Sequence, residues 1–243
     1  LEVYHKNEAE DYLLLEDMVK TYARENGVSY GYGRGSATGS LIAYLLKITE
    51  IDSVRRGLNF ERFMHTERIS LPDIDSDYSP NKRHIIQDFL MNHPDLYCAP
   101  IMTANTIALK GAIRDIGRGL EMPLSEVDEI AKNVEENEEY YRQKYPELFK
   151  YVDVAKGVIT SIGQHAAGIA VSPIPLDENM GLITTKDSKY PLTMLNMKEI
   201  DDQNYVKLDI LGLDTVEIIS ETCKLAGIDF VTPNTLDESD EDV

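Results

Sequence analysis

Three aspartates alternate with other residues in one short segment, residues 71–78, which reads Leu-Pro-Asp-Ile-Asp-Ser-Asp-Tyr. If this segment is a strand, successive side chains point to opposite faces, so Asp73, Asp75 and Asp77 share one face. Carboxylates held so close repel one another and destabilise the fold unless a cation neutralises them. The segment is therefore either an acidic edge strand facing water or a site for a hard, oxygen-preferring ion such as Mg²⁺. Acids are depleted from strands in general, and Ile74 suggests a half-buried strand, which favours the metal site.

A glycine-rich turn precedes this segment in the chain. Residues 27–36 read Gly-Val-Ser-Tyr-Gly-Tyr-Gly-Arg-Gly-Ser and are predicted to form a short strand and a turn, with a helix over 37–46. Glycines let the backbone approach a phosphate, and a helix N-terminus offers unpaired N–H groups. Ser36 supplies a hydroxyl and is also a good N-cap, so a tight turn with a serine cap is the alternative. The spacing fits neither the Walker nor the dinucleotide-binding pattern.

Together, the two features are more specific than either alone. A glycine–serine helix start followed by a strand of alternating aspartates is the arrangement of a nucleotidyltransferase palm. In such a palm the triphosphate lies on the helix N-terminus and the metal ions lie on the strand. Two ions held about 3.5–4 Å apart can activate an attacking oxygen and stabilise the leaving one.

The hydrophobic pattern along the chain predicts a sheet that is interrupted by helices and then resumed. Helices are expected over 7–25, 81–92 and 215–226, and strands over 69–78, 165–172 and 206–211. Residues 58–68 are expected to begin as a helix and then become irregular. Between them, residues 105–160 carry only helical patterns, over 107–120, 124–132 and 140–152, together with an acidic run at 135–139. This stretch is predicted to be a small helical subdomain.

Charge and cysteine content exclude several classes of protein. There are 24 Lys and Arg against 43 Asp and Glu among 243 residues, giving a net charge of −19. That balance excludes a basic, histone-like binder of nucleic acid, but not an enzyme that handles nucleic acid with a few local cations. Two cysteines are too few for a disulfide scaffold or a zinc site. No apolar stretch approaches the roughly 18 residues of a membrane span, and no signal pattern is present, so a cytoplasmic location is expected. Both ends of the sequence look like cuts through a longer protein.

Six segments, in this order along the chain, resemble the bacterial replicative polymerases of the C family, the DNA polymerase III alpha subunits. The first three resemble the palm of that family, and they lie at 33–44 (Gly-Arg-Gly-Ser-Ala-Thr-Gly-Ser-Leu-Ile-Ala-Tyr), 60–63 (Phe-Glu-Arg-Phe) and 67–75 (Glu-Arg-Ile-Ser-Leu-Pro-Asp-Ile-Asp). Residues 110–118 (Lys-Gly-Ala-Ile-Arg-Asp-Ile-Gly-Arg) resemble the start of the thumb, and 165–169 and 206–213 resemble the returning palm strands. The short gap between Ser36 and Asp73 leaves no room for the cysteine-rich insertion of the PolC branch, so the likeness is to the DnaE branch.

The resemblance implies an α+β fold, a polymerase-beta-like nucleotidyltransferase palm with an inserted helical thumb. Its first palm part would cover 1–104, the thumb 105–164 and the second palm part 165–214. Residues 215–243 would begin a truncated fingers region. This agrees with the interrupted sheet expected from the hydrophobic pattern.

The resemblance also assigns roles to single residues. Asp73, Asp75 and Asp209 would be the catalytic carboxylates and would hold two Mg²⁺ ions, for which Mn²⁺ can substitute. Asp77 would be either a nearby supporting acid or an occasional metal ligand. Contacts to the incoming triphosphate would come from the turn and from two cations, namely Gly35, Ser36, Arg62 and Lys207.

Three cations recur every four residues along the predicted thumb helix, Lys110, Arg114 and Arg118. Such a helix face could lie against DNA phosphates, where contacts position the protein without reading sequence. The alternative is that these cations pair with local acids on the surface. His165 is interpreted as either structural or adjacent to substrate.

The implied function is template-directed nucleotidyl transfer from a dNTP to a primer 3′-hydroxyl by a two-metal mechanism in DNA replication. Primer–template DNA and dNTP would be the ligands. The family's sliding clamp and other replisome subunits would bind through regions that this sequence lacks, and no membrane partner is expected. Two alternatives stay open: a catalytically incomplete DNA-binding or assembly fragment that holds metal without extending primers, and a template-independent nucleotidyltransferase. The isolated chain is expected to be inactive or very weak.

Overall fold

The computed structural model describes residues 1–64, 72 and 74–236. Within it the chain divides into two compact units. The first, called here the sheet unit, comprises Leu1–Met102 and Gln164–Val243. The second, the helical unit, comprises Thr103–Gly163, where sequence patterns predicted a helical subdomain over 105–160.

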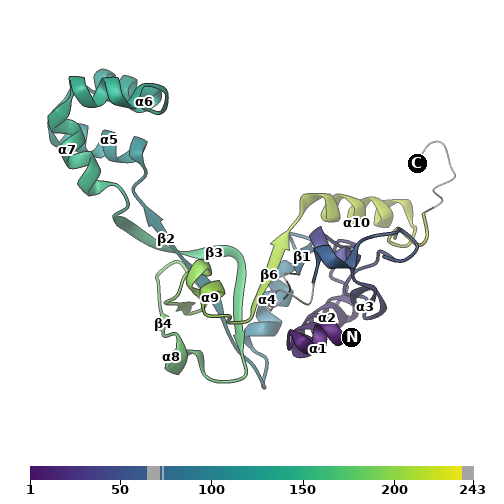
Figure 1. Ribbon diagram of the computed structural model, residues 1–243. Helices are drawn as coiled ribbons and strands as arrows, with labels where there is room; N and C mark the ends of the chain where they lie inside the picture. The colour runs from purple at the N-terminus through teal and green to yellow at the C-terminus, as the bar shows by residue number, and fades with distance from the viewer. Residues whose placement is uncertain (65–71, 73, 237–243) are drawn as a thin grey trace. The chain divides into compact units, whose positions relative to one another are not determined.

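The elements of each unit are shown in Figure 1. The helices of the sheet unit are α1 (Glu2–Lys6), α2 (Glu10–Glu25), α3 (Leu41–Leu45), α4 (Arg83–Met91), α8 (Leu176–Asn179), α9 (Met197–Asp202) and α10 (Asp214–Ala226), with 3₁₀ turns η1 (Gly35–Gly39) and η2 (Phe60–Arg62). Its strands are β1 (Asp75–Tyr78), β4 (Leu182–Ile183), β5 (Leu192–Thr193) and β6 (Lys207–Gly212). Two long strands, β2 (Tyr97–Thr106) and β3 (Ile159–Ser172), lead into and out of the helical unit, which contains α5 (Leu109–Gly119), α6 (Leu124–Lys144) and α7 (Pro146–Ala155).

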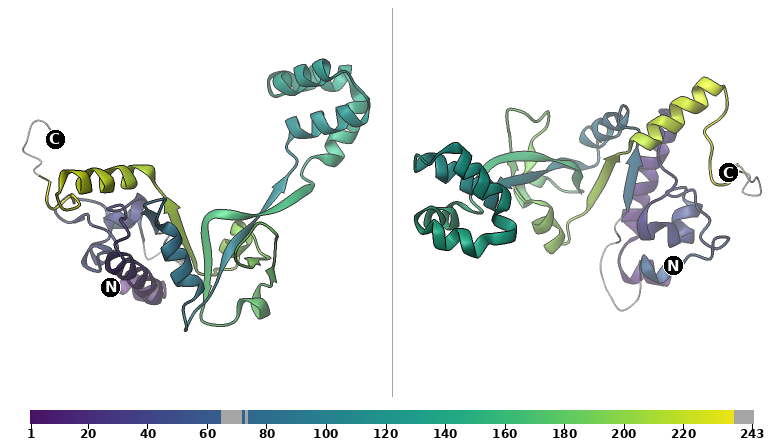
Figure 2. Two further views of the ribbon diagram at one scale, coloured as in Figure 1. Left: turned by 180° about the vertical axis from the view of Figure 1, so that it is seen from behind. Right: turned by 90° about the horizontal axis from the view of Figure 1, so that it is seen from above.

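The main sheet has the strand order β1-β6-β3-β2, so β6, the last of these strands in the sequence, lies between β1 and β3. The pairing of β1 with β6 is parallel, and the pairing of β3 with β6 is antiparallel. Two further views show β1 and β6 side by side, with α10 leaving the end of β6 (Figure 2). The short strands β4 and β5 form a separate antiparallel pair.

Alternation along β1 and β6 gives the sheet one buried face and one polar face. Ser76 and Tyr78 of β1 are buried, as are Leu208 and Ile210 of β6. Tyr78, Leu208 and Ile210 pack in a core shared with α2. The residues that alternate with them along the two strands stay partly accessible to solvent. Because side chains alternate between faces, the aspartates of both strands must lie on the face away from this core.

The helical unit has a core of its own. Ten buried residues from α5, α6 and α7 form it, among them Ile113, Ile130, Leu148 and Phe149. Close packing of α5 on α6 is visible at Gly117, where a Cβ atom would lie 2.6 Å from a methyl group of Val127.

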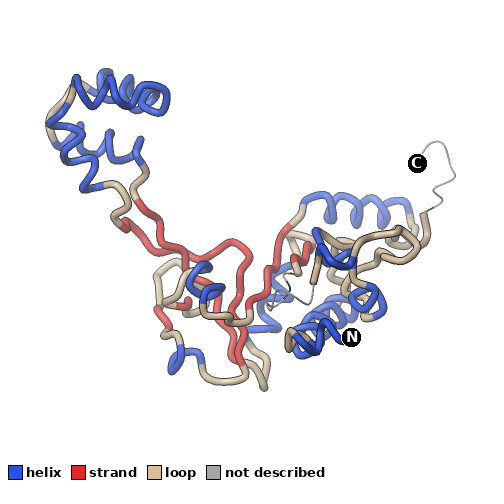
Figure 3. The backbone as a smooth tube through the Cα atoms, viewed as in Figure 1, coloured by secondary structure: helices blue, strands red, loops and turns tan. Residues whose placement is uncertain are grey.

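Most of the long elements predicted from periodicity are confirmed, as the backbone trace shows (Figure 3). The helices expected over 81–92 and 215–226 appear as α4 and α10, and the strand expected over 206–211 appears as β6. The helix expected over 7–25 appears as α2, which begins at Glu10, and the short helix α1 precedes the expected range. The helical patterns between 107 and 152 become α5, α6 and α7, while β3 begins six residues before its expected start at 165.

The prediction of a continuous helix over 37–46 is wrong, and so is the prediction of Ser36 as its N-cap. The chain forms the 3₁₀ turn η1 and then the short α3, and the capping residue is Ser40, whose hydroxyl accepts a hydrogen bond from the Ala43 N–H at 3.0 Å. The physical reason lies at Gly39, where a Cβ would stand 2.7 Å from the carbonyl oxygen of Asn59. Close approach of a second backbone thus interrupts the helix.

Other expectations around the site are met only in part. The short strand expected at the start of residues 27–36 is reduced to a single antiparallel bridge between Tyr30 and Tyr78. The carboxylate strand is described from Asp75 onward, and Asp73 lies outside the described residues. For the helix expected at the start of residues 58–68, the described part shows only η2. The long strand β2 was not predicted, because Pro100 within it is unfavourable for a paired strand.

Candidate active site

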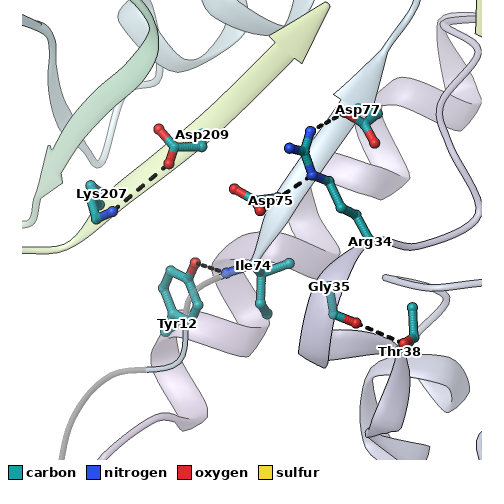
Figure 4. A network of polar contacts seen from close by, with 9 residues as sticks. All are labelled: Tyr12, Arg34, Gly35, Thr38, Ile74, Asp75, Asp77, Lys207 and Asp209. Atoms are coloured by element: carbon teal, nitrogen blue, oxygen red, sulfur yellow. Dashed lines mark hydrogen bonds and ion pairs between the residues drawn. The ribbon is translucent and has the colours of Figure 1, made fainter. Parts of the chain in front are cut away.

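Two aspartates from distant parts of the chain lie side by side on the polar face of the sheet. Asp75 of β1 is the register partner of Asp209 of β6, in a parallel pair. Their Cα atoms are therefore separated by about one strand spacing, roughly 4.8 Å. Both side chains point into the same space, as Figure 4 shows. The Asp75 side chain is 34% exposed and that of Asp209 is 13% exposed, so the pair is accessible from solvent but partly enclosed.

Asp77 extends this acidic surface by one step along β1, and a guanidinium bridges it to Asp75. Nε of Arg34 lies 3.5 Å from Oδ2 of Asp75, and Nη1 of the same side chain lies 3.2 Å from Oδ1 of Asp77. Arg34 was not among the predicted site residues. Its position directly before Gly35, in the turn already assigned to phosphate contacts, was the available signal.

Lys207 lies on the same face of β6 as Asp209, as expected for residues two apart in a strand. Its Nζ is 3.8 Å from Oδ2 of Asp209 and 3.5 Å from Oδ1 of Asp201 at the end of α9. The lysine is only 18% exposed. It therefore acts as a local counter-charge within the acidic surface rather than as a freely solvated surface lysine.

The glycine turn and η2 form one packed corner of the sheet unit. Gly35 has a φ of +60°, a conformation that favours glycine. Gly39 lies against the backbone of Asn59, which directly precedes η2 and caps it by accepting a hydrogen bond from the Glu61 N–H. Arg62 is exposed at the end of η2, and Ser36 is half-buried in η1. The fold thus holds the turn bearing Gly35 and Ser36 close to the segment bearing Arg62.

Beneath the carboxylates, on the buried face, lies a second layer of charge. Glu16 and Lys20, one turn apart on α2, are each 2% exposed. The Ser76 hydroxyl donates to Oε2 of Glu16 at 3.4 Å, and Nζ of Lys20 lies 4.5 Å and 4.7 Å from the ring centres of Tyr30 and Tyr78.

Burial dominates the ionisation of this pair. Loss of water raises the pKa of Glu16 and lowers the pKa of Lys20, and each charge offsets part of the shift of the other. Asp209 pushes the pKa of Glu16 further up, and Asp77 pushes the pKa of Lys20 up. The buried pair is therefore coupled electrostatically to the carboxylates on the opposite face.

The donor set suits a hard divalent cation. Asp75 and Asp209 supply carboxylate oxygens from adjacent strands, and such oxygens are the ligands that Mg²⁺ and Mn²⁺ prefer. Among the residues that the structure describes, no group of three or more His, Cys, Asp or Glu side chains is close enough to hold a metal ion. The third predicted carboxylate, Asp73, lies outside that part of the chain.

Each cation of the predicted DNA-binding face is paired with an acid inside the helical unit. Nζ of Lys110 lies 2.7 Å from Glu135, Nε of Arg114 lies 3.0 Å from Asp128, and Arg118 contacts Asp115. Local pairing was the alternative interpretation of this face, and the described contacts are of that kind. The pairs are exposed, and such pairs contribute little to stability and exchange readily.

His165 has a structural contact of its own. Its Nδ1 accepts a hydrogen bond from the Gly168 N–H at 2.8 Å. A Cβ on Gly168 would lie 2.9 Å from that same nitrogen, so the imidazole fits only against glycine. Gly168 is in turn the register partner of Asp209, so His165 supports the strand beside the carboxylate.

Sequence similarity agrees with the family suggested by the motifs. Residues 1–212 match a family model described as the bacterial DNA polymerase III alpha NTPase domain. The chain belongs to the bacterial DNA polymerase III alpha family. That membership confirms the predicted family.

Curated DNA polymerase III alpha subunits align with most of this chain. The subunit of Chlamydia muridarum is 36% identical over 231 residues, 88% of this chain and 19% of the relative. The subunit of Escherichia coli K12 is 34% identical over 231 residues, 86% of this chain and 20% of the relative. The subunit of Ureaplasma parvum is 33% identical over 240 residues, 93% of this chain and 25% of the relative. The chain thus spans about a quarter or less of the length of these DNA polymerase III alpha subunits.

Within the described ranges of this DNA polymerase III alpha chain, none of the helices has the length and apolar character needed to cross a bilayer.

Proposed function

We propose that this chain carries the catalytic palm and the thumb of a DNA polymerase III alpha subunit of the DnaE branch. The sheet unit would be a polymerase-beta-like nucleotidyltransferase palm, and the helical unit would be the thumb. The reaction would be template-directed transfer of a nucleotide from dNTP to a primer 3′-hydroxyl during replication in the cytoplasm. The family model's description as an NTPase domain supports a site that handles a nucleoside triphosphate.

The observation that carries this proposal is the parallel pairing of β1 with β6. It brings Asp75 and Asp209 into register from opposite sides of the helical insertion. A surface strand facing water would gain nothing from a second carboxylate placed beside the first. Repulsion between the two is a cost that a bound cation would remove.

Each residue then has a defined task. Asp75 and Asp209, with Asp73, would hold two Mg²⁺ ions, which when bound supply Lewis-acid activation of the attacking oxygen and stabilisation of the leaving one. Backbone N–H groups at Gly35 and Ser36 would orient the triphosphate. Lys207, already within the acidic surface, and Arg62, on the adjoining η2, would offset its negative charge.

Metal binding tests the proposal directly. The chain is titrated with Mn²⁺ in the presence and absence of dNTP, and free ion is counted by electron paramagnetic resonance. Bound ions, tightened by dNTP, are expected for the unaltered chain. Asp75→Asn and Asp209→Asn should each weaken binding by at least about tenfold, because each removes one of few charged ligands. Asp73→Asn tests the third carboxylate in the same way.

The control is Asp95→Asn, an exposed carboxylate of the same unit outside this surface. If Asp75→Asn and Asp209→Asn both leave Mn²⁺ binding as it is in the control, the proposed metal site is refuted. Primer extension with the same samples separates a polymerase from the alternative, a fragment that holds metal without extending primers. A template-independent transferase would instead extend a single strand without template.

A further inference from the structure

Arg34 occupies the acidic surface from the side opposite Lys207, and its placement is built into the turn. Gly33 has a φ of +144° and Gly35 a φ of +60°, so the arginine stands between two residues whose conformations favour glycine. A Cβ at Gly33 would lie 2.8 Å from a methyl group of Thr38. Arg34 itself is extended, with φ −140° and ψ 149°. The turn therefore presents the arginine side chain outward over β1, as Figure 4 shows.

The guanidinium contacts two carboxylates with different atoms. Nε faces Asp75 at 3.5 Å, and Nη1 donates a hydrogen bond to Asp77 at 3.2 Å. The two aspartates differ in enclosure, since the Asp77 side chain is 11% exposed and the Asp75 side chain is 34% exposed. The tighter contact is thus made to the more enclosed carboxylate, and the longer one to the carboxylate that faces Asp209.

Half of the Arg34 side chain is open to solvent. An ion pair in that setting is screened and weakly held, so the longer contact can be given up at small cost. A divalent cation at Asp75 and Asp209 carries twice the charge of the guanidinium and would sit close to its Nε. The two positive charges would repel each other and compete for the Asp75 carboxylate.

Resting on the proposed function, which puts a cation at Asp75 and Asp209, we propose that Arg34 is the resident counter-ion of this site. It neutralises Asp75 and Asp77 while no metal is bound. Cation binding displaces its Nε from Asp75 while Nη1 keeps its hydrogen bond to Asp77. Arg34 thereby lowers the site's affinity for free metal, which is the opposite effect to that of a metal ligand.

The test is a Mn²⁺ titration of the full chain, without nucleotide, at low ionic strength. Arg34→Met removes the competing charge and should tighten Mn²⁺ binding by about three- to tenfold, the range given by one unit charge a few ångströms away in a partly solvated site. Arg55→Met is the matched control, because it removes the same charge from an exposed position of the same unit and should change the affinity by less than about twofold. Arg34→Gln provides a second neutral variant with the same expected result.

Two further readouts identify the mechanism. The gain from Arg34→Met should shrink in about 0.5 M salt, where exposed charges are screened within a few ångströms. The Nε–H resonance of Arg34 should shift when diamagnetic Mg²⁺ is added to the unaltered chain, and it should not shift in Asp75→Asn.

The outcomes separate this inference from the proposed function. If both neutral variants bind Mn²⁺ no more tightly than the unaltered chain, while Asp75→Asn abolishes binding, then Arg34 is not a competing counter-ion and the metal site stands. If Asp75→Asn and Asp209→Asn both leave Mn²⁺ binding unchanged, the proposed function and this inference fall together.

Discussion

Glu16 and Lys20 show how single residues link the core to the polar face of the sheet. Both are almost fully buried, and both are coupled to carboxylates that lie across β1 and β6. Burial of an ion pair is costly, and replacing such a pair by apolar residues is often neutral or stabilising. Because Glu16 is coupled to Asp209 and Lys20 to Asp77, the pair contributes to the electrostatics of the polar face as well as to the core.

Glu16→Gln tests this pair. The substitution keeps a group that can accept the Ser76 hydrogen bond but leaves the Lys20 ammonium buried without its carboxylate. We expect the free energy of unfolding at pH 7 to fall by less than the roughly 3–5 kcal/mol of a fully ionised buried pair, because burial raises the pKa of Glu16 to about 7 and leaves its carboxyl partly protonated there. Burial lowers the pKa of Lys20 from its ordinary value of 10.5 to about 8. Between these two pH values the unfolded state therefore binds more protons than the folded state does. Stability of the variant should therefore recover between pH 7 and 10.

Urea denaturation at several pH values measures both effects. Glu25→Gln is the control, because Glu25 lies on the same helix but is exposed, and it should change stability by less than about 0.5 kcal/mol. An equal loss for both variants, or a loss that grows from pH 7 to 10, would contradict the assignment.

At the residue scale, the alternation of side chains along a strand made part of the site predictable. Asp75 and Asp77 could be placed on one face from spacing alone, and the structure describes both there. Asp209 was assigned only through family resemblance, because no local pattern reveals which strand a distant segment will join. Arg34, Glu16 and Lys20 were missed, since their contacts depend on tertiary packing.

At the element scale, α5 carries a basic face that is fully engaged with acids of its own unit. Lys110 reaches Glu135, and Arg114 reaches Asp128 on α6. If the helical unit is a thumb that grips DNA, phosphates must compete with these carboxylates. A change to either the cation or the carboxylate of a pair should therefore change the affinity for DNA.

Paired substitutions at Arg114 and Asp128 measure this competition. Arg114→Gln should weaken primer–template binding for every sequence and reduce the slope of log K against log salt by about 1, because one phosphate contact is lost. Asp128→Asn should have the opposite effect on affinity, since it frees Arg114 from its carboxylate. Fluorescence anisotropy with labelled duplex over a salt series follows both. If neither variant changes the affinity, this face does not contact DNA and pairing within the unit is its whole role.

Elements were predictable where they are long and strongly periodic. The helices α4, α5 and α10 and the strand β6 follow from apolar spacing. The turns η1 and η2 could not be predicted in this way, because their form depends on the close approach of Gly39 to Asn59. Such a tertiary contact leaves no periodic pattern in the sequence. Ser40 rather than Ser36 became the capping residue for the same reason.

At the scale of the whole molecule, the chain contains cores that do not depend on one another's residues. The core of the helical unit draws on α5, α6 and α7 alone, and the core around α2, β1 and β6 draws only on the sheet unit. The two should therefore unfold separately.

Leu148→Ala tests this independence. Leu148 is 2% exposed in the core of the helical unit, and its truncation should destabilise that unit by about 2–5 kcal/mol. Hydrogen exchange should show lost amide protection in α5, α6 and α7, with protection in β1 and β6 unchanged. Mn²⁺ affinity should also stay unchanged. Val154→Ala, at a position 76% exposed on α7, is the control and should alter neither. Loss of protection in β1 or β6 would instead show one cooperative unit.

The pairing of β1 with β6 has a consequence for how the chain folds. Asp75 and Asp209 become neighbours only after a strand on one side of the insertion meets a strand on the other. Contacts of such long sequence separation carry a large loop-closure cost and form slowly, whereas the local contacts of the helical unit form early. The insertion can therefore fold while the two carboxylates are still far apart. Their mutual repulsion then arises only at the last step of sheet assembly, where a cation would accelerate closure as well as stabilise its product.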